Sequence, residues 1–503
     1  MSSLSVACEE EGELRAALSL SHLTHSPGNY ALRYVPSQQS NEPSYEFYPK
    51  KGNGASRYMD LLSRTVPLSL YPVTFLMSSG ELFVQANKQA ILWNYQSQTE
   101  NRLPNVNGPP KVYPSSAGSV LLPLDPSNNY LETVLFCGGI SLGAGSAWGN
   151  EGGPATSLTD KSASNYCEQI QPLGNKQWTQ VDSVPTGRSM GQFIILPDGT
   201  LWFGNGVRKG TAGYGADPNS PGKPVGQSYG DDPEYQPYVY NPKAPAGLRW
   251  TPVGRGSDPR MYHSSATLLP DSSILVSGGN PNSDVTTKHW GTTYSVERWY
   301  PTYYDQTRPS NQGLPTTFGY GGKGFQLTFS NPLDASQASV VIIRTGFSTH
   351  AMNMGQRMIT LRSSAVGNVL NVAQLPANPN LFAPGPALAF VVVNGVPSQG
   401  IMVMVGNGKL GTQPVSAETV LPAATKVQTA STKGSNNSTN VANDVVSSSK
   451  SSSSSAAKSS SSSSSNESKA TNAIAAAVNS TVSKVIGLAT GNSEKGNSQV
   501  KRR

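Results

Sequence analysis

The chain has 503 residues, of which 36% are hydrophobic and only 13% charged, with a formal net charge of +7. This length allows two or three domains with sizeable cores, and 50 glycines with 38 prolines favour short strands joined by turns over long helices. Residues 407–503 carry the whole net charge, with eleven Lys and Arg against four Asp and Glu and no interleaved aromatic residues. The remainder is near neutral, which argues against a nucleic-acid partner. No run of about eighteen apolar residues occurs, so we expect no membrane span.

Residues 1–29 match no fold pattern. Acidic residues at Glu9–Glu11 stand where a secretion signal would need an apolar segment, so no such signal is recognised. Of the three cysteines, Cys137 and Cys167 lie in or beside strand-like segments and are candidates for a disulfide, which would require an oxidising compartment. Cys8 is left over.

Residues 30–300 repeat one local pattern, an apolar strand, a tight turn and a second apolar strand. It occurs as "TFLMSSGELFVQAN", "FIILPDGTLWFGNG" and "ATLLPDSSILVSGGN", and in a looser copy around 119–139. Hairpins that recur every few tens of residues are typical of β-propeller blades, because each small sheet is buried only against its neighbours. The pattern predicts about five blades in this region.

Residues 301–406 change to short alternating strands such as "ASVVIIRTGF" and "ALAFVVVNG", which predict an immunoglobulin-like β-sandwich. The last segment, 407–503, contains a nearly continuous serine run from Ser447 to Ser465. Such a composition is too polar to bury a core and predicts a disordered tail. The chain is therefore predicted to be all-β.

Two of the five histidines stand at informative places. His263 follows Tyr262 directly before a predicted strand, and His350 follows a strand of the predicted sandwich. Two imidazoles and a phenol gathered from two domains would suit an open copper site. Adjacent strand residues point to opposite faces, so Tyr262 and His263 can share one metal only at a strand end or a distortion. The alternative is a packed tyrosine beside a hydrogen-bonded imidazole.

Several separate stretches carry a family resemblance. "RMYHSSATLLPD", "GRSMGQFIILPDGTLWFGNG", "STHAMNMGQRM" and "AQLPANPNLFAPGPALAFVVVNGVPSQG" resemble the fungal glyoxal oxidases, which are copper radical enzymes related to galactose oxidase. The resemblance runs from about Tyr34 to Gly406 and implies a seven-bladed, kelch-type propeller followed by an Ig-like sandwich.

The resemblance also implies a chemistry. Tyr262 would be the axial tyrosine ligand and proton acceptor, and His263 and His350 the two imidazole ligands of one copper ion. The expected reaction is oxidation of small aldehydes such as glyoxal and methylglyoxal, or of primary alcohols, with O2 reduced to hydrogen peroxide. The expected location is extracellular or in the cell wall, with the tail as a spacer or tether.

The family also has a tyrosine cross-linked to a cysteine, and this pair is not assigned here. Both partners are expected upstream of the matching region, where Cys8, Tyr30 and Tyr34 stand in unsuitable contexts. We therefore expect that two blades and a secretion signal are missing from a truncated or mis-started gene product. The alternative function is a non-catalytic secreted or wall-associated propeller that binds a ligand.

Overall fold

The computed structural model describes residues 4–5, 16–18, 43–47, 52–65, 68–69, 71–140, 158–215, 224–286, 289–409 and 411–425. Strands dominate these residues, and the two α-helices among them, α1 (Asp60–Arg64) and α2 (Pro332–Ser336), have five residues each. No helix in the described part is long and apolar enough to span a membrane. The predicted all-β class is confirmed.

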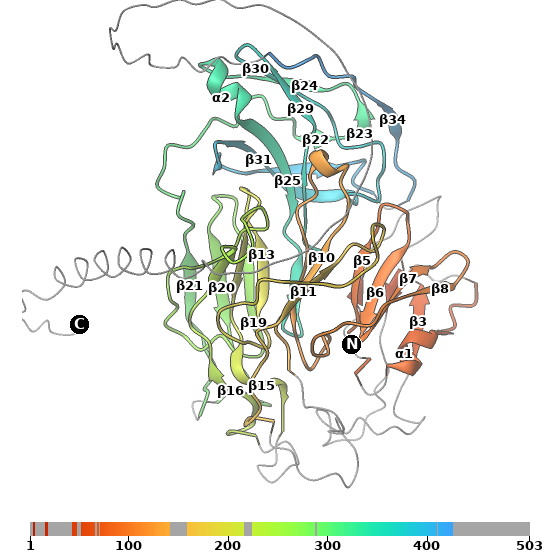
Figure 1. The fold of residues 1–503 in the computed structure, drawn as a ribbon, viewed down its shortest axis with the longest axis vertical. Helices are drawn as coiled ribbons and strands as arrows, with labels where there is room; N and C mark the ends of the chain where they lie inside the picture. Colours follow the sequence, from red (N-terminus) through yellow and green to blue (C-terminus); the bar gives the residue numbers. More distant parts are fainter. Residues whose placement is uncertain are drawn as a thin grey trace, which may run out of the picture. The chain divides into compact units, whose positions relative to one another are not determined.

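Up to Trp299 the described strands form five antiparallel sheets in chain order, together with a two-stranded ribbon (Figure 1). The first sheet is β1 (Leu4–Ser5), β2 (Ala16–Leu18), β3 (Ser44–Phe47) and β4 (Arg57–Tyr58), so two of its strands come from the segment in which the sequence shows no pattern. The second is β5 (Val73–Leu76), β6 (Leu82–Ala86), β7 (Gln89–Asn94) and β8 (Thr99–Leu103). The third is β9 (Gly118–Leu121), β10 (Val134–Cys137), β11 (Cys167–Ile170) and β12 (Thr179–Val181).

The fourth sheet is β13 (Gln192–Ile195), β14 (Leu201–Gly204), β17 (Tyr238–Tyr240) and β18 (Trp250–Pro252), with the ribbon β15 (Val207–Tyr214) and β16 (Ser228–Pro233) inserted after β14. The fifth has three strands, β19 (Ser264–Leu268), β20 (Ile274–Gly278) and β21 (Val296–Trp299). β13 contacts both β9 and β19, so the first strands of three successive sheets lie next to one another.

Turn chemistry sets the register of the repeated hairpins. Between β13 and β14 the Asp198 carboxylate accepts hydrogen bonds from the Thr200 amide at 3.0 Å and hydroxyl at 2.7 Å. Between β19 and β20 Asp271 accepts in the same way from Ser273, at 3.1 and 2.6 Å. An aspartate that bonds its own chain two residues later closes a tight turn, so the "PDG" and "PDS" pattern predicts these hairpins correctly.

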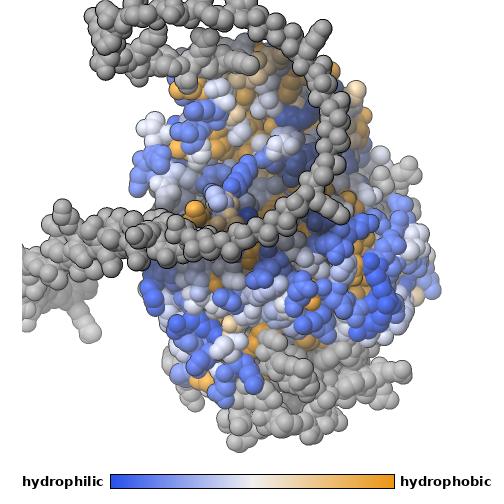
Figure 2. Space-filling model, in the orientation of Figure 1, coloured by the Kyte–Doolittle hydropathy of each residue, from blue (hydrophilic) through white to orange (hydrophobic). Residues whose placement is uncertain are grey.

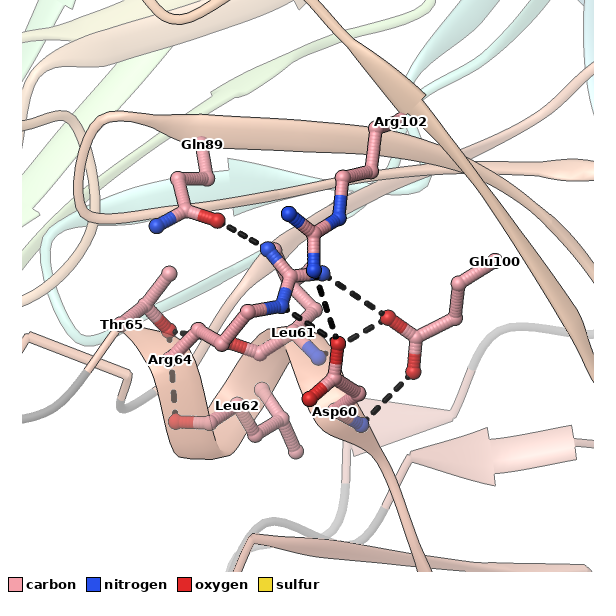
Figure 3. A network of polar contacts seen from close by, with 8 residues as sticks. All are labelled: Asp60, Leu61, Leu62, Arg64, Thr65, Gln89, Glu100 and Arg102. Atoms are coloured by element: carbon pink, nitrogen blue, oxygen red, sulfur yellow. Dashed lines mark hydrogen bonds and ion pairs between the residues drawn. The ribbon is translucent and has the colours of Figure 1, made fainter.

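A polar network joins α1 to the second sheet (Figure 3). Glu100 of β8 accepts from the backbone amides of Asp60 at 2.7 Å and Leu61 at 2.9 Å, at the helix N-terminus. Arg64 then donates to Asp60, Glu100 and Gln89. A carboxylate at a helix N-terminus satisfies amides that have no partner within the helix, so Glu100 holds this short helix in place.

The two predicted disulfide partners face each other in the third sheet. Cys137 of β10 and Cys167 of β11 are directly paired in the strand register, with Cα atoms 4.1 Å apart, and a disulfide joins them. Both side chains are fully buried. The bridge closes a loop that includes 141–157, a stretch outside the described residues.

The remaining strands form the sandwich. One sheet is β22 (Thr317–Phe318), β33 (Ile401–Val405), β31 (Gly385–Val393), β25 (Ala338–Arg344) and β28 (Arg357–Thr360), with β32 (Val396–Pro397) paired to β31. The facing strands are β24 (Phe325–Thr328), β30 (Val369–Val372) and β29 (Ser363–Val366), beside the pair β23 (Tyr320–Gly322) and β34 (Val415–Glu418). A hairpin, β26 (Phe347–Thr349) and β27 (Met352–Met354), extends from this domain.

The sheet that contains β25 is buried on both faces. Val340 and Ile342 pack in the core shared with the facing sandwich strands, whereas Val341 and Ile343 pack with Phe193 and other residues of β13 and β14. A strand covered on both sides is continuously apolar instead of alternating, which is what "ASVVIIR" shows. The sandwich and the hairpin-repeat region therefore share a hydrophobic core and belong to one compact unit.

The first part of the segment predicted as a polar tail, residues 407–503, contains a strand. β34 lies within it and pairs in parallel with β23, and the Thr425 amide donates to the Ala365 carbonyl at 2.9 Å. All four side chains of β34 are exposed, so the strand has no hydrophobic pattern that would predict it. Besides its backbone bonds, Glu418 pairs with Arg362 and accepts from the Ala377 amide. The serine run lies outside the described residues. On the visible face, hydrophilic residues are interspersed with scattered hydrophobic patches (Figure 2).

Replacing both bridged cysteines, in Cys137→Ala with Cys167→Ala, should lower the free energy of unfolding by about 3–4 kcal/mol, because the loop between them is no longer closed in the unfolded chain. Urea unfolding monitored by tryptophan fluorescence measures the change. Cys8→Ala is the control and should leave the midpoint unchanged. Three titratable thiols in the unreduced, unfolded wild-type chain would contradict the disulfide.

Candidate metal centre

Four residues that precede first strands of the sheets have left-handed backbones. Tyr71, Ser116 and Met190 lie two residues before β5, β9 and β13, and His263 directly precedes β19, with φ values of 48°, 47°, 61° and 65°. Non-glycine residues adopt this region rarely and at a cost in free energy, and they concentrate at functional sites. The chain is therefore bent where it enters each of these strands.

The bend at β19 brings Tyr262 and His263 to the same side. Their ring centroids are 4.0 Å apart, although they are neighbours in sequence. This meets the condition set by strand geometry, because both residues lie in the turn before β19 and not within the strand. Tyr262 is buried with 5% of its surface exposed, and His263 is exposed.

His350 reaches the site from the sandwich. It occupies, with Ala351, the two-residue turn of the β26–β27 hairpin, and both have positive φ values, 52° and 60°. Two-residue hairpin turns with two left-handed residues normally contain Asn or Gly, so His350 is held in a strained backbone. The hairpin contacts β9, β13 and β19, which places its tip beside the entrances of these strands.

Aromatic rings from distant parts of the chain surround His350. The ring of Tyr71 stacks on it at 3.6 Å, and the ring of Tyr113 lies edge-on at 5.6 Å. Tyr113 is also 6.0 Å from Tyr262, and the two phenol hydroxyls share a hydrogen bond. Tyr113, Tyr262, His263 and His350 thus form one cluster, against which Tyr214 and Trp290 pack.

Burial controls the protonation of the cluster. It lowers the pKa of His350 to about 4, with a further contribution from the His263 imidazole, so His350 is neutral near pH 7. Burial also raises the pKa of Tyr113 to about 12 and raises the pKa of Tyr262 further, because Tyr262 lies beside other phenols. Without an added positive charge both phenols keep their protons.

Each imidazole has a hydrogen-bond partner at its Nδ1 atom. His263 Nδ1 lies 2.6 Å from the carbonyl oxygen of Asn280, which can only accept, so Nδ1 carries the proton. His350 Nδ1 is 2.8 Å from the Thr349 hydroxyl. His263 Nε2 therefore keeps its lone pair, an arrangement typical of metal-binding histidines, whereas the Thr349 hydroxyl can donate to or accept from His350 Nδ1.

Tyr113 was not predicted as a site residue, because the second tyrosine was expected upstream of the region that resembles the family. A short pattern that occurs twice in the sequence would have pointed to Tyr113. "YPSSA" at Tyr113 and "YHSSA" at Tyr262 have the same Tyr-x-Ser-Ser-Ala pattern at or near the start of a first strand. Tyr113 precedes β9 by five residues and Tyr262 precedes β19 by two, so both lie where the chain enters a first strand, although not at equivalent positions.

A buried ion pair holds the segment that carries Tyr113. Lys111 Nζ lies 2.8 Å from Glu168, with both side chains fully buried, and burial lowers the pKa of Lys111. Glu168 also accepts from the amides of Asn107 and Gly108. Glu168 follows Cys167, so the disulfide-bonded sheet fixes this segment.

The donor set fits a copper ion better than other common metals. Among the described residues no three or more His, Cys, Asp and Glu side chains are grouped to hold a metal, so a site must use phenols. Two imidazole nitrogens and two phenol oxygens form a nitrogen–oxygen set, which suits Cu(II). The structure brings together all three sequence-predicted ligands, Tyr262, His263 and His350, and adds Tyr113.

Comparisons with known proteins agree over most of the chain. Residues 38–303 match the family described as "Glyoxal oxidase N-terminus", and residues 308–405 match "Galactose oxidase-like, Early set domain". The aldehyde oxidase GLOX of Vitis pseudoreticulata is 28% identical over 369 residues, which are 71% of this chain and 66% of the relative. The aldehyde oxidase GLOX1 of Arabidopsis thaliana is 28% identical over 393 residues, 72% of this chain and 60% of the relative.

A galactose oxidase of Gibberella zeae is 30% identical over 213 residues, 41% of this chain and 27% of the relative. A solved structure, titled "Novel fungal alcohol oxidase with catalytic diversity among the AA5 family, in complex with copper", aligns with a TM-score of 0.45 at 15% identity, over 78% of this chain and 81% of that one. The chain spans less than two thirds of the length of the curated relatives. The first family match alone covers more than half of the residues, so this chain belongs to the glyoxal oxidase family of copper radical oxidases.

Proposed function

We propose that the chain is an oxidase that uses one copper ion to oxidise small aldehydes, such as glyoxal and methylglyoxal, or primary alcohols. For an aldehyde the balanced reaction is RCHO + H2O + O2 → RCOOH + H2O2. The observation that carries the proposal is the convergence of Tyr113, Tyr262, His263 and His350 from three distant stretches of the chain. A packed core would not need two imidazoles, of which His350 is buried and neutral, beside two hydrogen-bonded phenols.

The residues assigned to the copper ion are His263, His350 and Tyr262, with Tyr113 as a further phenol. A bound copper ion would supply a one-electron redox couple and a positive charge that lowers the pKa of a neighbouring phenol. Neutral imidazoles are the form that binds metals, and the low pKa of His350 keeps it in that form.

Tyr262 is the proposed proton acceptor. Its hydroxyl lies in a buried cluster beside the exposed His263, where a small substrate can approach from solvent. Once deprotonated, a phenolate with such an elevated intrinsic pKa is a strong base for a substrate proton. Its hydrogen bond to Tyr113 orients the acceptor oxygen.

Tyr113 is the proposed second redox group, because copper alone stores one of the two electrons that the substrate gives up. The family resemblance implies a thioether to cysteine at such a tyrosine. Within the described residues the two cysteines are bonded to each other, and Cys8 lies outside them. The cross-link is therefore not assigned, and the non-catalytic binding protein stays as the second candidate function.

The proposed location is extracellular or the cell wall. The buried disulfide supports an oxidising compartment. The partners proposed are a small aldehyde or alcohol and O2, with no nucleic acid. The Ser-rich tail, outside the described residues, is proposed as the wall-associated part.

Replacing one imidazole ligand, in His350→Ala or His263→Ala, should weaken Cu(II) binding more than about 100-fold, a larger loss than for residues that only orient a ligand. Calorimetric titration with Cu(II) measures the affinity, and peroxide release from methylglyoxal measures the activity. His289→Ala, which changes an exposed histidine outside the cluster, is the control. Unchanged Cu(II) affinity in both variants would eliminate the site.

Tyr262→Phe removes the proton acceptor but keeps the aromatic ring. Peroxide release with saturating methylglyoxal should fall by about 10²–10⁴-fold, the usual contribution of a general base. Tyr240→Phe, a buried phenol in β17, is the matched control and should retain turnover. Equal turnover in both variants would show that another group accepts the proton.

Tyr113→Phe should separate metal binding from turnover. Both imidazoles remain, so Cu(II) affinity should change little, whereas peroxide release should be abolished because one of the two electron-accepting groups is gone. Peroxide release at the wild-type rate would refute the redox role of Tyr113. Absence of peroxide from the wild-type chain after Cu(II) loading and oxidation would favour the non-catalytic alternative.

A further inference from the structure

The first strands of the sheets have an edge that pairs with no strand. β13 is bonded to β14 and β19 to β20, each on one side only. On the other side, backbone groups of Phe193, Ile195, Ser264 and Ala266 point toward neighbouring elements. Buried amides and carbonyls without partners are costly, so something must satisfy these edges.

Two glutamine side chains do so in the same way. Gln192, on β13, donates to the Ser264 carbonyl at 2.9 Å and accepts from the Ala266 amide at 3.1 Å. Gln356, between β27 and β28, donates to the Phe193 carbonyl at 3.0 Å and accepts from the Ile195 amide at 2.6 Å. Each primary amide thus bonds the carbonyl of residue i and the amide of residue i+2, as a neighbouring strand would.

The two contacts form a continuous path between the imidazoles. Ser264 directly follows His263, and Gln192 ties it to β13. Gln356 then ties β13 to the hairpin that carries His350, and Asn353 of the same hairpin adds a bond to the Phe193 carbonyl at 3.1 Å. In each of these contacts a side-chain amide bonds the backbone of a β-strand.

Burial makes the path rigid. Gln192 is 1% exposed and Gln356 is 4% exposed, so water does not compete for these bonds. A bidentate amide fixes both the distance and the direction between the elements that it joins. A single hydrophobic side chain would fill the same volume without setting a register.

We infer that Gln192 and Gln356 are positioning residues that set the spacing of His263 and His350 for one metal ion. They contact neither imidazole and act through the backbone of β13. The inference rests on the proposed function, since it concerns the same metal centre. Filling the core would not require amide groups at these two positions, whereas setting the spacing of the imidazoles would.

The test uses the full chain with Cu(II) as the probe. Gln192→Met and Gln356→Met keep the length of the side chain and remove its hydrogen bonds. Each should weaken Cu(II) binding by about 10–100-fold, the usual effect of losing a group that orients a metal ligand. The electron paramagnetic resonance spectrum of bound Cu(II) should also change, because the imidazoles take up a different relative position.

Gln374→Met is the matched control. Gln374 also bonds a carbonyl and an amide, Lys323 at 3.3 Å and Gly319 at 3.0 Å, but it lies in the sandwich away from the hairpin. It should lower the thermal midpoint of the metal-free chain without altering the Cu(II) affinity or spectrum. If Gln356→Met does not fold, Gln356→Asn replaces it, because the shorter amide cannot reach both backbone groups.

The outcomes are distinct. Wild-type affinity and spectrum in folded Gln192 and Gln356 variants would overturn the inference, even if their thermal midpoints fall. A double variant that loses less affinity than the two single losses combined would support it, because the two bonds lie in series on one path. Wild-type Cu(II) affinity in both His350→Ala and His263→Ala would refute the proposed function itself.

Discussion

The proposed metal centre depends on β13 and the residues at its entrance, which bond to the segments that carry the cluster. The Met190 amide, at the entrance of this strand, donates to the Ser116 carbonyl at 2.7 Å and so holds the turn after Tyr113. Gln192 connects the strand to the segment that follows His263, and Gln356 connects it to the hairpin of His350. All four residues of β13 are buried, and the strand packs in a hydrophobic core shared with the neighbouring sheets and the sandwich, so its position is set by packing.

Strain and burial prepare these residues for metal chemistry. His263, His350 and Ala351 have left-handed backbones, which the surrounding sheets and hairpin enforce. Burial keeps His350 neutral and both phenols protonated before a metal is bound. The shared core between the sandwich and the sheets keeps the hairpin from moving away from the strand entrances.

The hairpins and the apolar strands could be predicted because they depend on residues that are close together in the sequence. The aspartate turns at Asp198 and Asp271 and the apolar strands around them are visible in sequence, and so is the continuous apolar run of β25. The strand β34 could not be predicted, because its exposed side chains have no hydrophobic pattern and it is held by backbone bonds to β23 and by polar contacts of Glu418. The proposed role of Tyr113 was missed because Tyr262, whose ring centroid lies 6.0 Å from that of Tyr113, is far along the chain, and only the packing of the sheets brings the two together.

The amino-acid sequence by itself determined the all-β class, the hairpin repeat, the sandwich after it and the residue types suited to copper, since these follow from periodicity, turn chemistry and donor atoms. The tertiary structure alone decided which side chains meet. The stacking of Tyr71 on His350, the bond between Tyr113 and Tyr262, and the two glutamine contacts with free strand edges all join segments that are far apart in the chain. Such contacts depend on how sheets pack against one another, and no local pattern in the sequence specifies that packing.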